Sequence, residues 1–483
     1  MKKILVFASL LSLMFTSCNK INEDNTTDKA KVQFALHLPT VATKADQLAT
    51  TNESTINTVS VWVFGPTGVA ATTGNFEQYV FADFTPSGTA YELPDGKAFS
   101  TEAGNGKIIY IGVNVPTAFD VAYTSEGALK AAIATLTQGT PANRLLTWTG
   151  TGSATNVAMF SNRQVVNLAA YDPAANSGAG NIQEVSADIH RIVSKVVTTK
   201  QAATFTNDWA TLASDATLPV LTYTIMDNAV YQDAHASFLA QQTPSLIDIN
   251  DAPATWSNVL NPHFAAVAST DHKFKAVTTL AAGSTEAQRQ GIDGFYVGEN
   301  KPTVAKYGNA TYTLVRTGVS VNRTAKVNSA GTAIEWVASV YGYDAIPANR
   351  TDVHVMYKDG NCYIVDDANL SQVATFLGNG TPIDAQTYTD GYVYFMVYLN
   401  PSASYNVDRN QYVHVDITGI EQSLTFGTNV YPGDPTDPEV PTEPDPGQPN
   451  PYDPPLVIDG QSQLKVKITI APWDYVATPT VLK

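Results

Sequence analysis

Lys31-Val-Gln-Phe-Ala-Leu-His-Leu38, near the start of the chain, and Leu464-Lys-Val-Lys-Ile-Thr-Ile-Ala-Pro-Trp473, near its end, are the stretches that decide the fold. In both, apolar side chains alternate with polar ones, which is typical of a strand with one buried face. An isolated strand is not stable in water, so each must pair with a sheet. The side chains predicted to share the buried face are Val32, Phe34, Leu36 and Leu38 in the first strand, and Leu464, Val466, Ile468 and Ile470 in the second, which ends with Pro472 and Trp473.

The rest of the chain also consists mainly of short predicted strands. Short runs rich in β-branched and aromatic residues predict strands, among them 59–64, 107–115, 184–198, 312–321 and 411–420. Gly, Pro, Asn and Asp punctuate them, and residues 127–137 form one of few helix candidates. Many short strands with few helices indicate antiparallel sandwiches or barrels.

The length and net charge of the chain limit its possible domain number and the classes of partner that it can bind. The chain has 483 residues, enough for two or three domains, and 44% of them are hydrophobic, so it can build real cores. Only 15% are charged, and the formal net charge is −16. Such a field repels nucleic acid and anionic lipid, so a nucleic-acid-binding role is set aside. A run of small residues at 176–181 marks a candidate domain boundary.

The first seventeen residues read as an export signal. Two lysines precede a mostly apolar run of twelve residues, which is too short to span a membrane. The run closes with Thr16-Ser17-Cys18, a pattern that looks like a bacterial lipoprotein signal cleaved before Cys18, which is then acylated. The alternative is an ordinary secretory signal. The other cysteine, Cys362, is predicted to be a small buried side chain, so a lipidated Cys18 leaves no intrachain disulfide.

A spacer precedes the C-terminal strand. Ten of the 24 residues of 432–455 are proline and six are acidic, a composition that predicts an extended, self-repelling segment. The strand at 464–473 therefore has two options: it pairs with its own chain, or it adds to the sheet of another molecule. A loop of this length inside one domain is uncommon, which favours pairing between molecules.

The loop after the N-terminal strand suggests how such pairing is controlled. Residues 40–57 contain a single basic residue, Lys44, so a surface protease that cuts between Lys44 and Ala45 would free residues 18–44. Four buried apolar side chains contribute roughly 6–12 kcal/mol, at about 1.5–3 kcal/mol each. Exchange against an intact strand is therefore close to neutral, whereas filling a vacated groove is favourable. Proteolysis would act as the assembly switch.

Taken together, these features resemble those of a known family, the Mfa-type and FimA-like structural fimbrillins that form the type V pili of Bacteroidales. The resemblance covers nearly the whole chain and rests on the order of its motifs. These are the lipoprotein start at Cys18, Ile189-His-Arg-Ile-Val-Ser-Lys195, Gly294-Phe-Tyr-Val-Gly-Glu-Asn300, Tyr398-Leu-Asn-Pro401, Tyr412-Val-His-Val-Asp-Ile417, the acidic proline spacer and Lys467-Ile-Thr-Ile-Ala-Pro-Trp473.

The resemblance implies an all-β chain with two tandem transthyretin-like antiparallel sandwich domains. It predicts a signal peptide at 1–17, a propeptide with a removable strand at 18–44, domains at 45–181 and 182–431, a spacer at 432–455 and a donor strand within 456–483. It also implies a stalk subunit of a cell-surface fimbria that supports adhesion. Such a subunit is tethered by lipid to the outer membrane, trimmed by a surface trypsin-like protease and polymerised with other copies and with tip and anchor subunits.

One departure from the family concerns the cut. The family's protease is arginine-directed, yet the first arginine here is Arg144, so the only basic site in the loop is Lys44. Either a trypsin-like or lysine-directed enzyme cuts after Lys44, or the chain stays uncut and acts as a lipid-tethered anchor. The C-terminal strand argues for a stalk subunit.

No enzyme motif is found. The chain lacks a Gly-x-Ser-x-Gly elbow, a phosphate-binding Gly-x-x-x-x-Gly-Lys loop and a His-Glu-x-x-His zinc motif, and its seven histidines do not sit at metal-site spacings. We therefore predict no catalytic, cofactor or metal residue, and expect a structural or interface role for His190-Arg191. The competing functions are a surface lipoprotein that binds glycan or protein without polymerising and, more remotely, a secreted hydrolase.

Overall fold

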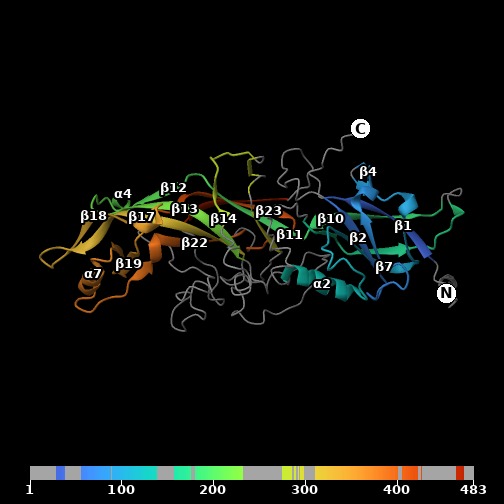
Figure 1. Cartoon of the computed structure of the whole chain (residues 1–483), viewed down its shortest axis with the longest axis horizontal. Helices are drawn as coiled ribbons and strands as arrows, with labels where there is room; N and C mark the ends of the chain where they lie inside the picture. The colour runs from blue at the N-terminus through green and yellow to red at the C-terminus, as the bar shows by residue number, and fades with distance from the viewer. Residues whose placement is uncertain are drawn as a thin grey trace, which may run out of the picture.

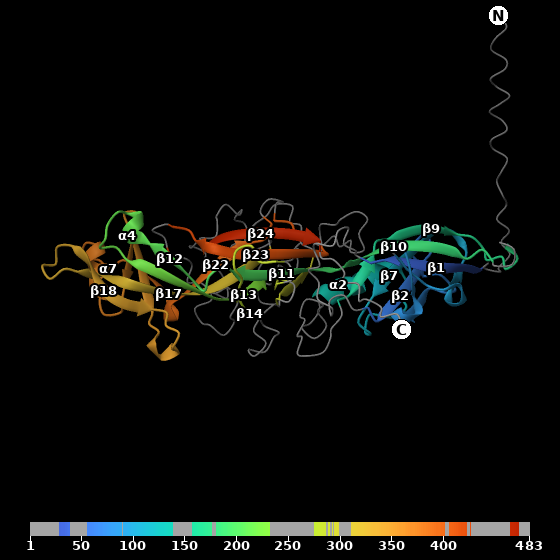
Figure 2. The same cartoon turned by 90° about the horizontal axis from the view of Figure 1, so that it is seen from above.

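The computed structural model describes residues 29–38, 56–88, 90–138, 157–175, 180–231, 275–285, 288–289, 292, 294–298, 311–400, 405–422, 426 and 464–472. These residues are mostly β-strand, which confirms the expectation of a β protein with sandwich-like sheets. The prediction of purely antiparallel sheets was wrong, because residues 32–37 pair in parallel with 183–188 and residues 195–200 pair in parallel with 412–417. The molecule is elongated, with the N-terminal strands at one end and β17 (Tyr312–Val327), β18 (Ile334–Gly342) and α7 (Leu370–Leu377) at the other (Figures 1 and 2).

The N-terminal unit is built on one sheet of ten strands that folds over its own core. Its order is β3-β2-β7-β8-β10-β1-β5-β4, with β6 beside β1 and β9 beside β7. The bounds are β1 (Lys29–His37), β2 (Thr58–Phe64), β3 (Phe76–Val80), β4 (Thr85–Ser87), β5 (Ala90–Glu92), β6 (Phe99–Glu102), β7 (Gly104–Val113), β8 (Met159–Ser161), β9 (Gln164–Leu168) and β10 (Gln183–Arg191).

The C-terminal unit contains three sheets. The first has the order β15-β11-β23-β24, with β16 beside β11. The second has the order β12-β13-β17-β18, with β14 beside β13 and β22 beside β17, and the third is β20-β19-β21. The bounds are β11 (Val193–Lys200), β12 (Thr204–Asp208), β13 (Val220–Tyr231), β14 (Lys275–Ala276), β15 (Thr278–Thr279), β16 (Phe295–Gly298), β17 (Tyr312–Val327), β18 (Ile334–Gly342), β19 (Val353–Lys358), β20 (Asn361–Val365), β21 (Gln386–Tyr388), β22 (Tyr392–Tyr398), β23 (Gln411–Ile420) and β24 (Leu464–Pro472).

Helices are few and short among the described residues. They are α2 (Glu126–Gln138), α4 (Trp209–Leu212), α7 (Leu370–Leu377) and the 3-10 turns η1 (Phe81–Asp83), η2 (Asp95–Lys97), η6 (Pro347–Asn349) and η7 (Thr389–Gly391). The helix predicted at 127–137 is present as α2. The sequence reasoning did not predict α7, whose buried Val373 and Leu377 pack on Met356 and Val365 of the third sheet.

The strand expected at 184–198 is two strands in two different sheets. Residues up to Arg191 pair with β1 and β8 of the N-terminal sheet, whereas β11 pairs with β16 and β23. The change of sheet falls at Ile192, beyond the boundary expected at 181–182. Ile192 is 1% exposed and belongs to a core that also contains Trp62 and Phe160 of the first unit and Val197 and Tyr412 of the second. The two units are therefore packed together rather than loosely linked.

Phe34 tests how much β1 contributes to the N-terminal core. Its side chain is fully buried, with its ring centroid 5.9 Å from that of Phe99. Phe34→Ala should lower the free energy of unfolding by about 3–5 kcal/mol, because it removes a large apolar group and leaves a cavity. Urea unfolding measures the change. The matched control, Gln33→Ala on the half-buried opposite face of β1, should stay within about 1 kcal/mol of the wild type; equal losses for the two variants would contradict the placement of β1.

Candidate functional site

The N-terminal strand lies in the middle of its sheet and not at an edge. Strand β1 runs parallel to β10 along the register from Val32–Gln183 to His37–Asp188. Its other edge is antiparallel to β5 and β6, where Ala35 faces Glu92 and Val32 faces Phe99. Figure 2 shows β1 beside β10 along the N-terminal unit. The backbone of β1 therefore satisfies hydrogen bonds on two neighbours at once.

One face of β1 is wholly inside the core. Val32, Phe34 and Leu36 are 0% exposed and Leu38 is 3% exposed, so all four positions predicted to be buried are buried. They pack into one cluster with side chains of β2, β7 and β10. Removing the strand would open a long apolar groove between β10 and the β5–β6 edge.

The opposite face of β1 makes polar contacts. The Lys31 Nζ lies 4.4 Å from the centroid of the Tyr171 ring, and the His37 Nε2 lies 2.7 Å from the Ser186 Oγ. Backbone hydrogen bonds outside the regular ladders also hold the strand: the Leu93 N–H donates to the Phe34 carbonyl (3.0 Å), and the Tyr171 N–H donates to the Lys29 carbonyl (2.7 Å).

The C-terminal strand β24 occupies an edge. It is antiparallel to β23, from Ile420–Leu464 to Gln411–Pro472, and forms the last strand of its sheet. Leu464 is 4% exposed in the C-terminal core, and the Thr418 hydroxyl donates to the Lys465 carbonyl over 3.0 Å. Of the two options left open for this strand, the single chain adopts pairing with itself.

The two terminal strands share a pattern. Lys31-Val32-x-Phe34-x-Leu36 in β1 corresponds to Lys465-Val466-x-Ile468-x-Ile470 in β24, with a basic residue followed by three apolar side chains at every second position. Alternation of this kind places all three on one face of a strand. At the level of sequence, β24 could present to a groove the apolar face that β1 presents.

Behind β24, a buried polar cluster joins β11 to β23. The His414 Nε2 lies 2.8 Å from the Thr199 Oγ1, and that hydroxyl donates to the Asp416 Oδ1 over 3.0 Å. His414 is 5% exposed and faces Thr469 of β24 in register. Burial lowers the pKa of His414 to about 4, opposed by Asp416 and reinforced by Arg289 and Lys467.

Several predicted sites lie outside the described residues. These are Cys18, Lys44, Ala45, Trp473 and the proline spacer, together with the side chains of Val466, Ile468 and Ile470. Cys362 is 7% exposed, as predicted for a small buried side chain, and burial raises the pKa of its thiol to about 12. A thiol held protonated in this way is a poor nucleophile.

His190-Arg191 lies at the junction of the two units. Arg191 is 0% exposed, and its Nη1 donates to the Asn410 Oδ1 over 3.4 Å, across from β10 to the start of β23. Burial lowers the pKa of His190. The expected structural role at an interface therefore fits the placement of Arg191. The junction itself has no signal in the sequence, because it depends on contacts between distant segments.

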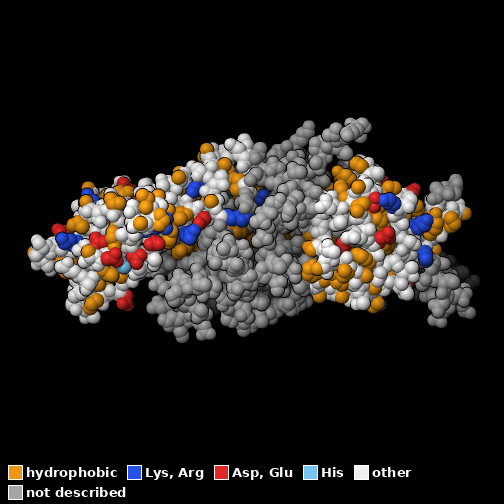
Figure 3. All heavy atoms as spheres, viewed as in Figure 1, with side chains coloured by type: hydrophobic (Ala, Val, Ile, Leu, Met, Phe, Trp, Pro, Cys, Tyr) orange, Lys and Arg blue, Asp and Glu red, His pale blue; other side chains and the backbone are white. Residues whose placement is uncertain are grey.

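In the described part of the chain, no three His, Cys, Asp or Glu side chains are placed to hold a metal ion. Within the same residues, no helix has the length and apolar content to cross a bilayer. Figure 3 shows acidic and basic side chains interspersed among apolar ones on the face in view.

Protonation of His414 should weaken the folded state. Its pKa is about 4 in the fold and about 6.5 in the unfolded chain, so the unfolded state binds more protons between these values. The stabilisation is complete above pH 7 and is lost as the pH falls toward 4, by up to about 3 kcal/mol. Urea unfolding at pH 7.5 and 4.5 should show a smaller loss for His414→Gln than for the wild type. Equal losses would contradict the buried, neutral state of His414.

Comparisons with known proteins give a consistent group of structures. No family model matches the chain, and no curated protein matches it significantly. Among solved structures, the fold is similar to a fimbrilin (FimA) of Porphyromonas gingivalis, with a TM-score of 0.42, 13% identity and coverage of 93% of this chain and 99% of that one. A candidate cell adhesion protein of Parabacteroides distasonis has a TM-score of 0.42, 11% identity and coverage of 92% and 99%.

A third similar structure is the tip fimbrial protein Mfa3 of Porphyromonas gingivalis with a C-terminal truncation. Its TM-score is 0.35, its identity is 10%, and the match covers 92% of this chain and 100% of that one. The solved structures to which this chain is similar thus include two fimbrial proteins of Porphyromonas gingivalis.

Proposed function

We propose that this chain is a structural stalk subunit of a cell-surface fimbria, polymerised by exchange of β24 into the place of β1. The observation that carries the proposal is the position of β1. A strand close to the start of the chain fills the middle of a sheet with a fully buried face, and the last strand repeats its apolar pattern. The first strand is thus a plug, and the last strand is a matching replacement.

The position of Lys44 makes the plug removable. The described strand ends at Leu38 and the chain re-enters the fold at Ile56, so Lys44 lies between β1 and β2. A cut after Lys44 leaves residues 18–44 held by non-covalent contacts alone. In the proposed precursor, Cys18 carries the lipid that holds the chain on the outer membrane, and the cut releases the body from it.

Backbone hydrogen bonding favours the transfer of β24 from β23 of its own chain into the vacant β1 groove of a neighbour. Among the described strands, β24 pairs with β23 alone, at the end of its sheet, so the donor strand has one described backbone ladder there. In the β1 groove a strand has two ladders, one to β10 and one to β5 and β6. Each added backbone hydrogen bond contributes about 0.5–1.5 kcal/mol. A vacant groove on a neighbour is therefore the better site, whereas an occupied groove offers no gain.

The shared pattern also fixes a register. With Lys465 in the place of Lys31, Leu464, Val466, Ile468 and Ile470 take the inward positions of Ala30, Val32, Phe34 and Leu36. Lys467 then takes the place of Gln33, whose partner on β10 is Glu184. This register pairs a lysine with a carboxylate across the strands, which is a favourable cross-strand pair.

A lipid-tethered protein that binds glycan or protein, or that serves as a fimbrial anchor or tip, is the second candidate. The pairing of β24 with β23 of the same chain favours it, since that arrangement needs no second molecule. The two candidates differ at the N terminus of protein recovered from shed filaments. Mass spectrometry should find Ala45 first in a processed stalk subunit and an acylated Cys18 in the tethered protein.

Deletion of residues 456–483 tests the requirement for the donor strand. The truncated chain should stay folded and be processed, yet form no filaments, because it has nothing to place in a neighbour's groove. Electron microscopy of surface filaments measures the outcome. Filaments of normal length from the truncated protein would sink the strand-exchange mechanism. Circular dichroism of the purified protein checks that the loss of β24 does not unfold the body.

A designed disulfide tests the register. In the proposed filament Thr469 takes the place of Ala35, directly beside Ser186 on β10 of the next subunit, within the Cα separation that a disulfide needs. Ser186→Cys with Thr469→Cys should give a ladder of covalent oligomers under mild oxidation, in filaments and not in the uncut precursor. The matched control, Ser186→Cys with Lys467→Cys, lies two residues out of register and should cross-link at least tenfold less. Equal cross-linking of the two pairs would contradict the register.

A further inference from the structure

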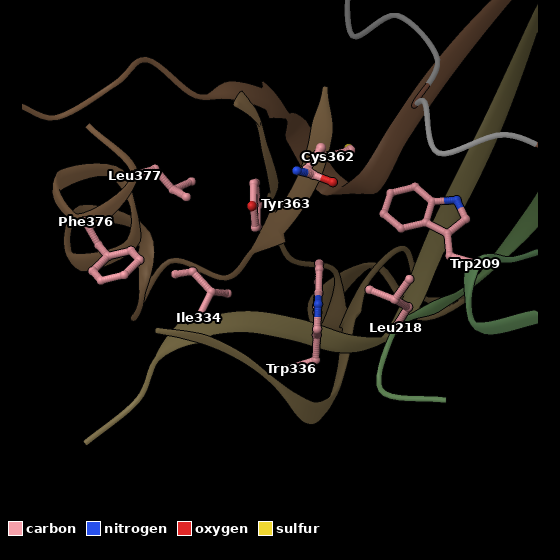
Figure 4. Close-up of a pocket in the computed structure, with 9 residues that line it drawn as sticks. Trp209, Leu218, Ile334, Trp336, Cys362, Tyr363, Phe376 and Leu377 are labelled. Carbon is pink, nitrogen blue, oxygen red and sulfur yellow. The ribbon is translucent and has the colours of Figure 1, made fainter. Parts of the chain in front are cut away.

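An aromatic groove opens at the end of the C-terminal unit farthest from β1. It has a volume of about 390 Å³ and is lined by side chains from α4, β18, β20 and α7. Figure 4 shows Trp336 and Tyr363 in its middle, Trp209 toward one end and Phe376 toward the other. The rings of Trp336 and Tyr363 are nearly parallel, at 7°, with centroids 6.4 Å apart. Aromatic rings thus line the groove in a row.

The chain leaves the described fold next to this groove. The last described residue before the spacer is Phe426, whose N–H donates to the Tyr357 Oη over 3.2 Å. Tyr357 is the cross-strand partner of Cys362, which lines the groove. Pro432 lies six positions after Phe426, and six residues of extended chain reach at most about 20 Å. The first prolines of the spacer are therefore within reach of the aromatic row.

The spacer has a period that matches this kind of surface. Its first five prolines are spaced by three residues, at Pro432, Pro435, Pro438, Pro441 and Pro444. A polyproline II helix has three residues per turn and a rise of about 3.1 Å, so in that conformation these five rings would lie on one face at about 9 Å intervals. The acidic residues Asp434, Asp437, Glu439 and Glu443 fall on the other two faces. As a polyproline II helix, the segment would carry its prolines along one edge and its acidic side chains on the other two faces.

We propose that the aromatic groove binds the segment 432–444 of its own chain, as a polyproline II helix with the proline edge against Trp336 and Tyr363. Aromatic grooves bind such helices because the helix is preformed, so little entropy is lost on docking, and because its carbonyls are free to accept hydrogen bonds. Trp336 and Tyr363 each carry a donor, the indole N–H and the phenol hydroxyl. Attachment to the same chain gives the segment an effective concentration in the millimolar range, enough to hold a weak contact.

Hydroxyl-radical footprinting of the full-length monomer tests the proposal. Changing Pro432, Pro435, Pro438, Pro441 and Pro444 to Ala should raise the oxidation rates of Trp336 and Tyr363 at least threefold, because the cover is lost. The matched control changes Pro446, Pro449 and Pro451, which lie off the three-residue period, and should leave both rates within about 30% of wild type. Trp62 is 0% exposed in the core at the junction of the two units and serves as an internal reference. Neither variant alters a described residue, so both should melt like the wild type.

Two results would overturn the proposal. Equal oxidation rates in the wild type and the five-proline variant would show that the spacer does not cover the groove. Protection that disappears when the wild-type monomer is diluted from 100 μM to 1 μM would assign the groove to a segment of another molecule. Protection that is independent of dilution and is lost only with the in-period prolines supports docking within the chain.

Discussion

The parallel pairing of β1 with β10 is the contact on which the N-terminal unit depends. It joins the two halves of the ten-stranded sheet, because β10 pairs with β8 on its other edge while β1 continues into β5 and β6. Strands in the middle of a sheet satisfy backbone groups on both sides and bury a face, so they contribute more than edge strands do. Here that central role falls to a segment near the chain start, joined to the rest of its unit by the residues between Leu38 and Ile56.

The terminal strands therefore differ in what holds them. Strand β1 has two neighbours and four buried apolar side chains, whereas β24 has one described strand partner and lies at the end of its sheet. A mid-sheet position is hard to enter while it is filled, and an edge position is easy to leave. In the proposed exchange, covalent continuity, rather than a difference in affinity alone, would decide which strand occupies the groove in an intact chain.

Much of the local structure could be predicted from the sequence, and the long-range arrangement could not. The buried face of β1 follows from its period of two, and α2 and β23 follow from equally local patterns. The break at Ile192 has no local signal, because β-branched residues continue through it and only pairing with different sheets divides the run. Helix α7 was missed because it has eight residues and its Asn369 N-cap makes no side-chain capping bond. The aromatic groove joins Trp336 and Tyr363 from separate hairpins, which periodicity cannot bring together.

The direct passage from β10 to β11 through Ile192 has a mechanical consequence. A single buried residue separates strands of the two units, and the surrounding core ties Trp62 and Phe160 of one unit to Val197 and Tyr412 of the other. The junction therefore contains no linker that could extend and no hinge about which the two units could rotate freely. Under tension along the long axis of the molecule, the two units should move as one stiff body.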